Sequence, residues 1–176
     1  QALSKVPAPS QLLRARYEVV KFYGRVKELE DLGDWCADSS PLLIRLYTGQ
    51  GGQGKTRLML ELCRRQRKSG WHAGFIRATA GRAEPTVWSV LLSLDQPLLL
   101  VLDYAEGHSE LIAKLLSQIK ASERTAPKVR VVLLARADLD WWAALASDPE
   151  IPSTWLQPPY THILPLEPIT TPESPE

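Results

Sequence analysis

A glycine-rich segment carries the strongest chemical signal in the sequence. It reads Gly-Gln-Gly-Gly-Gln-Gly-Lys-Thr over residues 49–56 and matches the pattern G-x-x-x-x-G-K-[ST] at every fixed position. Glycines let a backbone wrap closely around a phosphate and point its N–H groups inward. We therefore expect a phosphate-binding loop (P-loop) whose contacts come from Gly49, Gln50, Gly51, Gly52, Gln53, Gly54, Lys55, Thr56 and Arg57.

Two residues of this loop and one distant acid have the chemistry of a Mg²⁺–phosphate site. Lys55 would reach the β- and γ-phosphates, and Thr56 would offer its hydroxyl to Mg²⁺. Asp103 directly follows the aliphatic run 98–102, where an acid is costly unless it meets water, a metal or a partner at the strand end. We predict that Asp103 binds Mg²⁺ through water. The alternative is that it caps the following helix.

Two further charged residues follow buried runs and could complete the chemistry. Glu106 is the nearest carboxylate beyond Asp103 and could act as a general base on an attacking water. Its alternative is a solvated loop residue. Arg136 ends a buried run, at the strand edge where ligands bind in open α/β folds, and could neutralise the γ-phosphate. Its alternative is an ion pair with one of the aspartates that follow it. Lys55, Asp103, Glu106 and Arg136 are thus the predicted catalytic residues.

Strand and helix patterns alternate along the chain and would position these residues. Short apolar runs predict strands over 41–47, 71–77, 97–103, 128–136 and 162–166. Helical spacing predicts helices over 27–36, 55–68, 85–94, 108–120 and 138–147. This order predicts an α/β fold of the P-loop NTPase type, with a mostly parallel five-stranded sheet and helices on both faces.

Length and composition fit one globular domain and exclude several classes of protein. The chain has 176 residues, of which 44% are hydrophobic and 23% charged. The net charge of +1 gives no bias toward nucleic acid or acidic membranes. Cys36 and Cys63 show neither disulfide-framework nor metal spacing, which favours a cytoplasmic location. No apolar run reaches the roughly 18 residues of a membrane span.

Prolines concentrate toward the carboxyl end, where 8 of the 14 fall at or after Pro149. Each proline removes a backbone donor, so we expect no regular domain core in that segment. We predict a lead-in over residues 1–16 and a nucleotide-binding domain over 17–166. Residues 167–176 would form a linker toward a further C-terminal domain that this fragment lacks.

Together these pieces resemble the STAND class of signalling NTPases, which includes the NB-ARC-type ATPases of immune receptors and apoptotic scaffolds and their bacterial relatives. Residues 22–29 are similar to that family's x-G-R-E-x-E-L segment, and residues 49–58 to its G-x-G-G-x-G-K-T-x-L loop. Residues 98–103 resemble its Walker B strand, and 131–136 the strand that ends in a sensor arginine.

The resemblance implies an adenine-nucleotide switch that exchanges ADP for ATP and hydrolyses ATP slowly with Mg²⁺. It places Tyr23, Gly24 and Arg25 near adenine and Arg136 near the γ-phosphate. The implied partners are the nucleotide and further helical, winged-helix and sensor-repeat domains of the same chain. Homo-oligomerisation on activation is also implied, whereas nucleic acid and membrane are not.

Two positions depart from the family pattern, and rival functions fit less well. Val26 replaces the usual glutamate, and Tyr104 stands where a second acid is common, which implies weak hydrolysis. A GTPase needs Asp-x-x-Gly and Asn-Lys-x-Asp, but Glu106 occupies the glycine position and residues 135–138 lack both Asn and Lys. A small-molecule kinase needs a lid with several arginines, which we do not find. A binding module without significant hydrolysis, or another P-loop ATPase or kinase, stays as the alternative.

Overall fold

The computed structural model describes residues 13–14, 24–77, 79, 85–122, 127–136 and 138–168. The strands are β1 (Leu13–Arg14), β2 (Leu42–Thr48), β3 (His72–Ile76), β4 (Leu98–Asp103), β5 (Val129–Ala135) and β6 (Thr161–Pro165). The α-helices are α1 (Val26–Ala37), α2 (Lys55–Lys68), α3 (Pro85–Leu92), α4 (Ser109–Ala121) and α5 (Asp140–Ala146). Short 3-10 helices follow β4 and α5 at η3 (Ala105–Gly107) and η4 (Ser153–Leu156).

The strands form one sheet in the order β1-β3-β4-β5-β2-β6. Its last five strands pair in parallel, which confirms the predicted α/β fold with a mostly parallel five-stranded sheet. Strand β1 pairs antiparallel with β3 and was not predicted, because it is only two residues long and lies in the expected lead-in. The rest of the lead-in over residues 1–16 lies outside the described residues.

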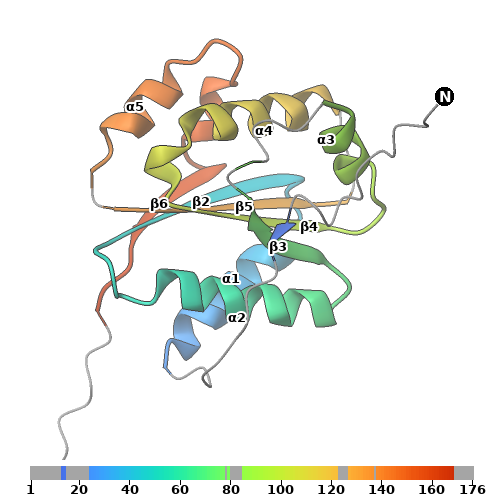
Figure 1. The fold of residues 1–176 in the computed structure, drawn as a ribbon. Coiled ribbons are helices and arrows are strands. Elements are labelled where there is room, and N and C mark those ends of the chain that lie inside the picture. The colour runs from blue at the N-terminus through green and yellow to red at the C-terminus, as the bar shows by residue number, and fades with distance from the viewer. Residues whose placement is uncertain are drawn as a thin grey trace, which may run out of the picture.

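Alternate residues of each strand face opposite layers of helices. In β2, Leu42, Ile44 and Leu46 pack into the cluster that includes α4. Leu43 and Tyr47 point to the opposite face of β2 and pack into the cluster of α1 and α2. Figure 1 shows α1 and α2 on one side of the sheet and α3, α4 and α5 on the other. Because both faces of β2, β4 and β5 are covered, these strands are buried along almost their whole length and are mostly apolar.

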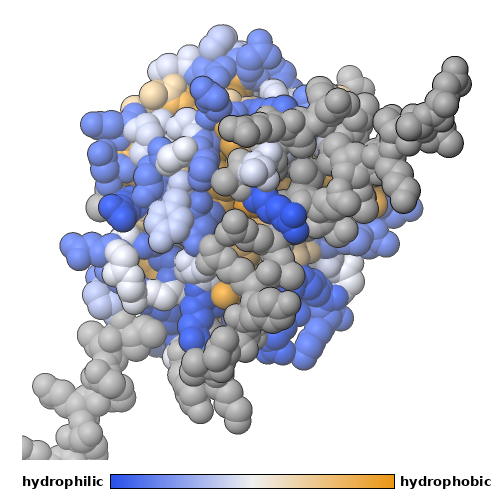
Figure 2. Space-filling view, in the orientation of Figure 1, coloured by the Kyte–Doolittle hydropathy of each residue, from blue (hydrophilic) through white to orange (hydrophobic). Residues whose placement is uncertain are grey.

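Most described residues on the face drawn in Figure 2 are hydrophilic, and hydrophobic ones show only in small areas. This distribution follows from the layered core, which buries the apolar sides of sheet and helices. Within the described ranges, no helix combines the length and the apolar character that a membrane crossing requires.

The core extends into the proline-rich segment, contrary to the expectation from its composition. Ile151 and Leu156 are buried against the α4 side of the sheet, and Leu166 is buried on the α2 side. Pro165 ends β6, an edge strand of the sheet, where a missing N–H is tolerated. Of the predicted linker 167–176, only residues 167 and 168 are described.

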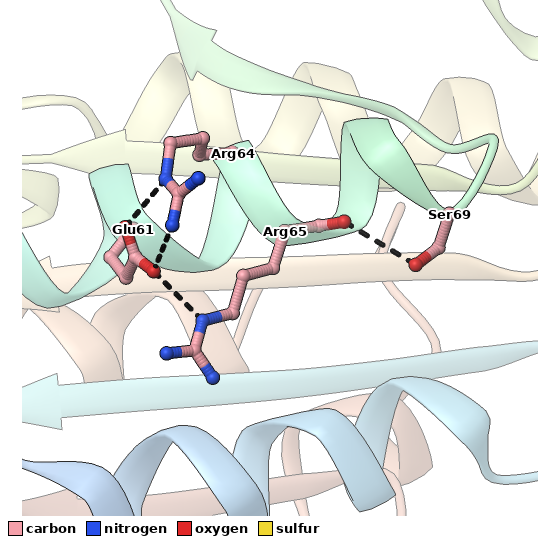
Figure 3. A network of polar contacts seen from close by, with 4 residues as sticks. All are labelled: Glu61, Arg64, Arg65 and Ser69. Carbon is pink, nitrogen blue, oxygen red and sulfur yellow. Dashed lines mark hydrogen bonds and ion pairs between the residues drawn. The ribbon is translucent and has the colours of Figure 1, made fainter.

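Helix α2, which follows the P-loop, carries a small charged network around the buried Glu61. Arg64 donates to both carboxylate oxygens of Glu61 at 2.6 and 2.8 Å, and Arg65 Nε donates to one of them at 2.8 Å. The Arg64 hydrogen bond and then that of Arg65 lower the pKa of Glu61 to about 2, against the effect of burial. Figure 3 shows this network together with Ser69, whose hydroxyl donates to the Arg65 carbonyl. It keeps a nearly buried carboxylate ionised without joining the loop.

A buried arginine closes the carboxyl end of α1. Arg130 is fully buried near the start of β5, and its guanidinium donates to the carbonyls of Trp35, Asp38 and Ser40. The last carbonyls of a helix lack intrahelical partners and favour a positive charge. Burial lowers the pKa of Arg130, but a guanidinium remains protonated. Both this guanidinium and that of Arg45 lie over the indole ring of Trp35, at 5.8 and 5.0 Å from the ring centroid.

We predict that Arg130→Met lowers the free energy of unfolding by about 2 kcal/mol, because buried carbonyls lose their donor. Urea denaturation measures the change. The matched control is Lys128→Met, which removes a cation whose ammonium donates to the Ala37 carbonyl at an exposed position of the same helix end. The control change should stay within about 0.5 kcal/mol. Equal losses in the two variants would contradict the capping role of Arg130.

Candidate functional site

The strand order brings the predicted site residues to one edge of the sheet. Strands β4, β5 and β2 are neighbours and run in parallel, so their carboxyl ends lie side by side. Asp103 is the last residue of β4, Arg136 directly follows β5, and the P-loop joins β2 to α2. Figure 1 shows this loop beside the chain that leaves β5. This edge is where ligands bind in open α/β sheets.

The glycines give the loop a shape that other residues would strain. Gly52 and Gly54 have φ angles of 85° and 82°, in the left-handed region. At Gly51 and Gly52, a Cβ would meet no atom within 4 Å, so the outer side of this turn is open. Gly54 is the N-cap of α2. An open turn that leads into a helix N-terminus is suited to binding an anion.

The side chain of Lys55 curls back over the loop. Its Nζ donates to the carbonyls of Gly49 and Gln50. Burial lowers the pKa of Lys55, whereas the carboxylates of Asp103 and Glu106 oppose this lowering. The ammonium is therefore held at the centre of the loop by neutral acceptors, within the field of two acids.

A direct contact joins α2 to the end of β4. Thr56 Oγ1 donates to Asp103 Oδ2 at 2.7 Å, and the other oxygen of Asp103 accepts the Tyr104 N–H at 3.1 Å. A hydroxyl and a carboxylate are hard oxygen donors of the kind Mg²⁺ takes, usually with only one or two protein carboxylates. In the described ranges no three His, Cys, Asp or Glu side chains gather as a metal-binding group. The donor set thus fits Mg²⁺ held jointly with phosphate, and not a metal held by protein alone.

Glu106 and Arg136 face each other across the edge of the sheet. Arg136 Nε lies 4.0 Å from Glu106 Oε1, and the arginine side chain is 74% exposed. The second oxygen of Glu106 is buried and has no hydrogen-bond partner among the described residues. The observed partner of Arg136 is therefore Glu106, rather than one of the aspartates that follow it. This weak contact leaves the guanidinium exposed to solvent and one buried carboxylate oxygen unpaired.

These residues line a common cavity of about 290 Å³. Its lining consists of Gly51, Gly52, Gln53, Gly54, Lys55, Thr56, Arg57, Asp103, Tyr104, Glu106, Leu134, Ala135 and Arg136. The other predicted site residues do not line it: Gly49 and Gln50 form the entry to the loop, and Gly24 and Arg25 precede α1. Tyr23 lies outside the described residues.

Three lining residues were not predicted as part of the site. Leu134 and Ala135 close β5 just before Arg136, so their position at the strand end was the signal that could have identified them. Tyr104 follows Asp103 with a left-handed φ of 55° and a side chain that is 59% exposed. A non-glycine residue in this conformation is uncommon, and no local pattern in the sequence announces it.

Comparisons with known proteins identify a family for most of the chain. The model of a family described as Novel STAND NTPase 5 matches residues 25–149. No curated protein matches the chain.

The chain is also similar to solved structures, of which two are described here. The Orc1 protein of Aeropyrum pernix in complex with DNA has a TM-score of 0.52 and 18% identity, over 96% of this chain and 52% of that one. A katanin chain from a study of its self-assembly has a TM-score of 0.49 and 13% identity, over 82% and 51%. The chain therefore spans about half the length of either protein. At such identities the likeness to Orc1 concerns the fold alone.

Proposed function

This chain belongs to the STAND NTPases, in the family described as Novel STAND NTPase 5, and we propose that it binds ATP or ADP with Mg²⁺ and hydrolyses ATP slowly. The observation that carries the proposal is the 2.7 Å hydrogen bond from Thr56 to Asp103, made at the mouth of a glycine loop. It joins the two oxygen donors that a Mg²⁺–phosphate site needs. The family match supports an NTPase module; the choice of adenine is our proposal.

The loop and the charged and hydroxyl residues of the cavity each have a task in this proposal. The N–H groups of the loop and the start of α2 bind the phosphates, and Lys55 gives up its carbonyl acceptors to pair with the β- and γ-oxygens. Thr56 and Asp103 hold Mg²⁺, which when bound neutralises charge on the phosphates. Arg136, exposed and weakly paired, turns from Glu106 to the γ-phosphate.

Glu106 is then the group placed to accept a proton from an attacking water. Its buried oxygen has no described hydrogen-bond partner, and it lies in the same cavity as Lys55 and Arg136. The position next to Asp103 offers no second carboxylate, since Tyr104 occupies it. We infer that water activation depends on Glu106 alone and is slow.

The regulatory part of the proposal concerns the whole protein. We propose that the unit over residues 17–166, which contains the matched range 25–149, exchanges ADP for ATP under the control of helical, winged-helix and sensor domains. Homo-oligomerisation on activation stays a prediction. The DNA of the Orc1 complex is a property of that protein, and the net charge of +1 here gives no independent reason to expect nucleic acid.

We expect the purified chain to bind ATP but to release phosphate at well below ~1 s⁻¹, the low end of ordinary enzyme turnover. Glu106→Gln should reduce this residual rate by about 10²-fold while ATP binding persists, because the amide keeps the size of the side chain but cannot accept a proton. Single-turnover phosphate release measures the hydrolysis rate. Calorimetry with ATP and with GTP measures the preference for adenine over guanine.

The matched control is Glu110→Gln, an exposed carboxylate in the first turn of α4, which should leave the rate unchanged. A rate of several per second would show a complete ATPase and contradict slow turnover. An unchanged rate in Glu106→Gln would remove Glu106 as the base. Intact binding with no phosphate release at all would favour a binding module without hydrolysis, and tighter GTP binding would overturn the choice of adenine.

A further inference from the structure

Arg25 enters the fold through an unusual stretch of backbone. Gly24 and Arg25 have successive φ angles of 76° and 53°, both left-handed, just before α1 begins. For a residue with a Cβ this conformation costs on the order of 1 kcal/mol or more. Such backbone strain persists only where surrounding contacts stabilise it. At Arg25 these contacts are the hydrogen bonds of its own side chain.

The guanidinium of Arg25 joins three separate parts of the chain. Its side chain is only 5% exposed, and Nη1 donates to Glu28 Oε1 at 2.7 Å. Its Nη2 donates to the Gln53 carbonyl in the P-loop at 2.8 Å, and to the Glu167 carbonyl at 2.6 Å. One nitrogen thus binds the phosphate loop and the chain that leaves β6.

We call the residues after β6 the exit segment (Leu166–Pro168). This segment lies against the beginning of the P-loop. The Leu166 N–H donates to the Thr48 carbonyl at 2.8 Å. A Cβ on Gly49 would lie only 3.2 Å from the Leu166 carbonyl oxygen, so the two backbones are in close contact. Figure 1 shows the chain descending from β6 past the loop between β2 and α2. The exit segment therefore touches the loop at its first residue and, through Arg25, near its last.

The bond to Gln53 decides where a neighbouring donor points. In a trans peptide the carbonyl and the following N–H point in opposite directions. Because Arg25 fixes the Gln53 carbonyl, it also fixes the opposite direction of the Gly54 N–H. Gly54 lines the cavity, so Arg25 sets the direction of an N–H beside the place that we propose for the phosphates.

We propose that Arg25 is a positioning residue that orients the P-loop for phosphate and ties its shape to the exit segment. The inference deepens the proposed nucleotide site and rests on it. It differs from a contact with adenine, because both Nη atoms of Arg25 are already engaged by protein acceptors.

A ligand without a base separates these two roles of Arg25. We expect Arg25→Lys to weaken binding of both ATP and inorganic tripolyphosphate by about tenfold in calorimetry, the effect of losing one charge-assisted hydrogen bond. Lysine keeps the charge but not the planar fork that reaches two acceptors at once. Arg64→Lys, in α2 and outside the cavity, is the matched control and should change neither affinity. A loss for ATP with tripolyphosphate unchanged would overturn the proposal in favour of an adenine contact.

Amide hydrogen exchange tests the link to the exit segment without any nucleotide. Arg25→Lys should accelerate exchange by about tenfold at two amides together: that of Leu58, which donates to the Gly54 carbonyl at 2.9 Å, and that of Leu166, which donates to the Thr48 carbonyl. Arg64→Lys should accelerate neither. Faster exchange at only one of these amides would contradict a link between the P-loop and the exit segment through Arg25. If Arg25→Lys fails to fold, Glu28→Gln removes only the ion pair that orients the guanidinium and should give the same pattern more weakly. If the wild type bound neither ATP nor tripolyphosphate, the proposed function would be refuted. The exchange experiment would still test whether Arg25 links the P-loop to the exit segment.

Discussion

Lys55→Ala should weaken binding of Mg²⁺-ATP and of ADP by about 100-fold and leave the fold intact. A charge-assisted hydrogen bond is worth roughly 1.5–3 kcal/mol, which corresponds to about ten- to a hundredfold in affinity. We expect the upper end because Lys55 is partly buried among the loop carbonyls, where its charge is less screened. The fold should survive because these acceptors are loop carbonyls outside the hydrophobic core. Calorimetry gives the affinities, and thermal unfolding gives the stability.

The control for this variant removes the same charge from the other end of the same helix. Lys68→Ala lies in the exposed last turn of α2, outside the cavity. It should bind both nucleotides as the wild type does, because a surface charge that far from the loop is screened. Equal affinities in wild type and Lys55→Ala would refute the assignment of residues 49–56 as a phosphate-binding loop.

Asp103→Asn should weaken the binding of ATP in the presence of Mg²⁺ by about 100-fold, and so remove most of the affinity that Mg²⁺ adds. The affinity for ADP without metal should change little. The substitution keeps an oxygen that can accept the Thr56 hydroxyl but removes the negative charge that a divalent cation needs. Titrating ATP with and without Mg²⁺ measures the two affinities separately. This design separates a metal ligand from an acid that only holds the end of β4.

Asp148→Asn is the matched control, because Asp148 also accepts a backbone N–H through one carboxylate oxygen and lies outside the cavity. It should preserve the whole effect of Mg²⁺. An equal loss of ATP affinity with and without metal in Asp103→Asn would instead identify Asp103 as a structural residue at the strand end.

The parts of the site that could be predicted are those that depend on a pattern of neighbouring residues in the sequence. The loop over 49–56 and the acid after the run 98–102 each have a local pattern and a local context of strand and turn. The parallel sheet followed from apolar runs separated by helical spacing, and this fold was confirmed. The roles of the individual site residues stay predictions.

Contacts between distant segments could not be predicted in this way. The bond from Arg25 to Glu167 spans 142 positions of the sequence, and no periodicity relates its two ends. Arg130 reads as one polar residue in an apolar strand, and only the packing of α1 against the sheet gives its guanidinium three carbonyl acceptors. The proline-rich segment was judged by its composition, but burial of Ile151 and Leu156 depends on the space left beside α4. Tertiary packing decides all three features.

The strand order also bears on how the protein is made. Strand β2, which carries the loop, pairs with β5 and β6, and both of these lie in the last third of the sequence. On a ribosome β2 therefore emerges long before either neighbour, and β3, which follows it, belongs elsewhere in the sheet. An apolar strand with two open edges can pair with other chains, and parallel pairing of distant segments is slow. Nascent chains that stop before β5 should thus require protection by chaperones, and the glycine loop acquires its shape only after β5 and β6 have been synthesised.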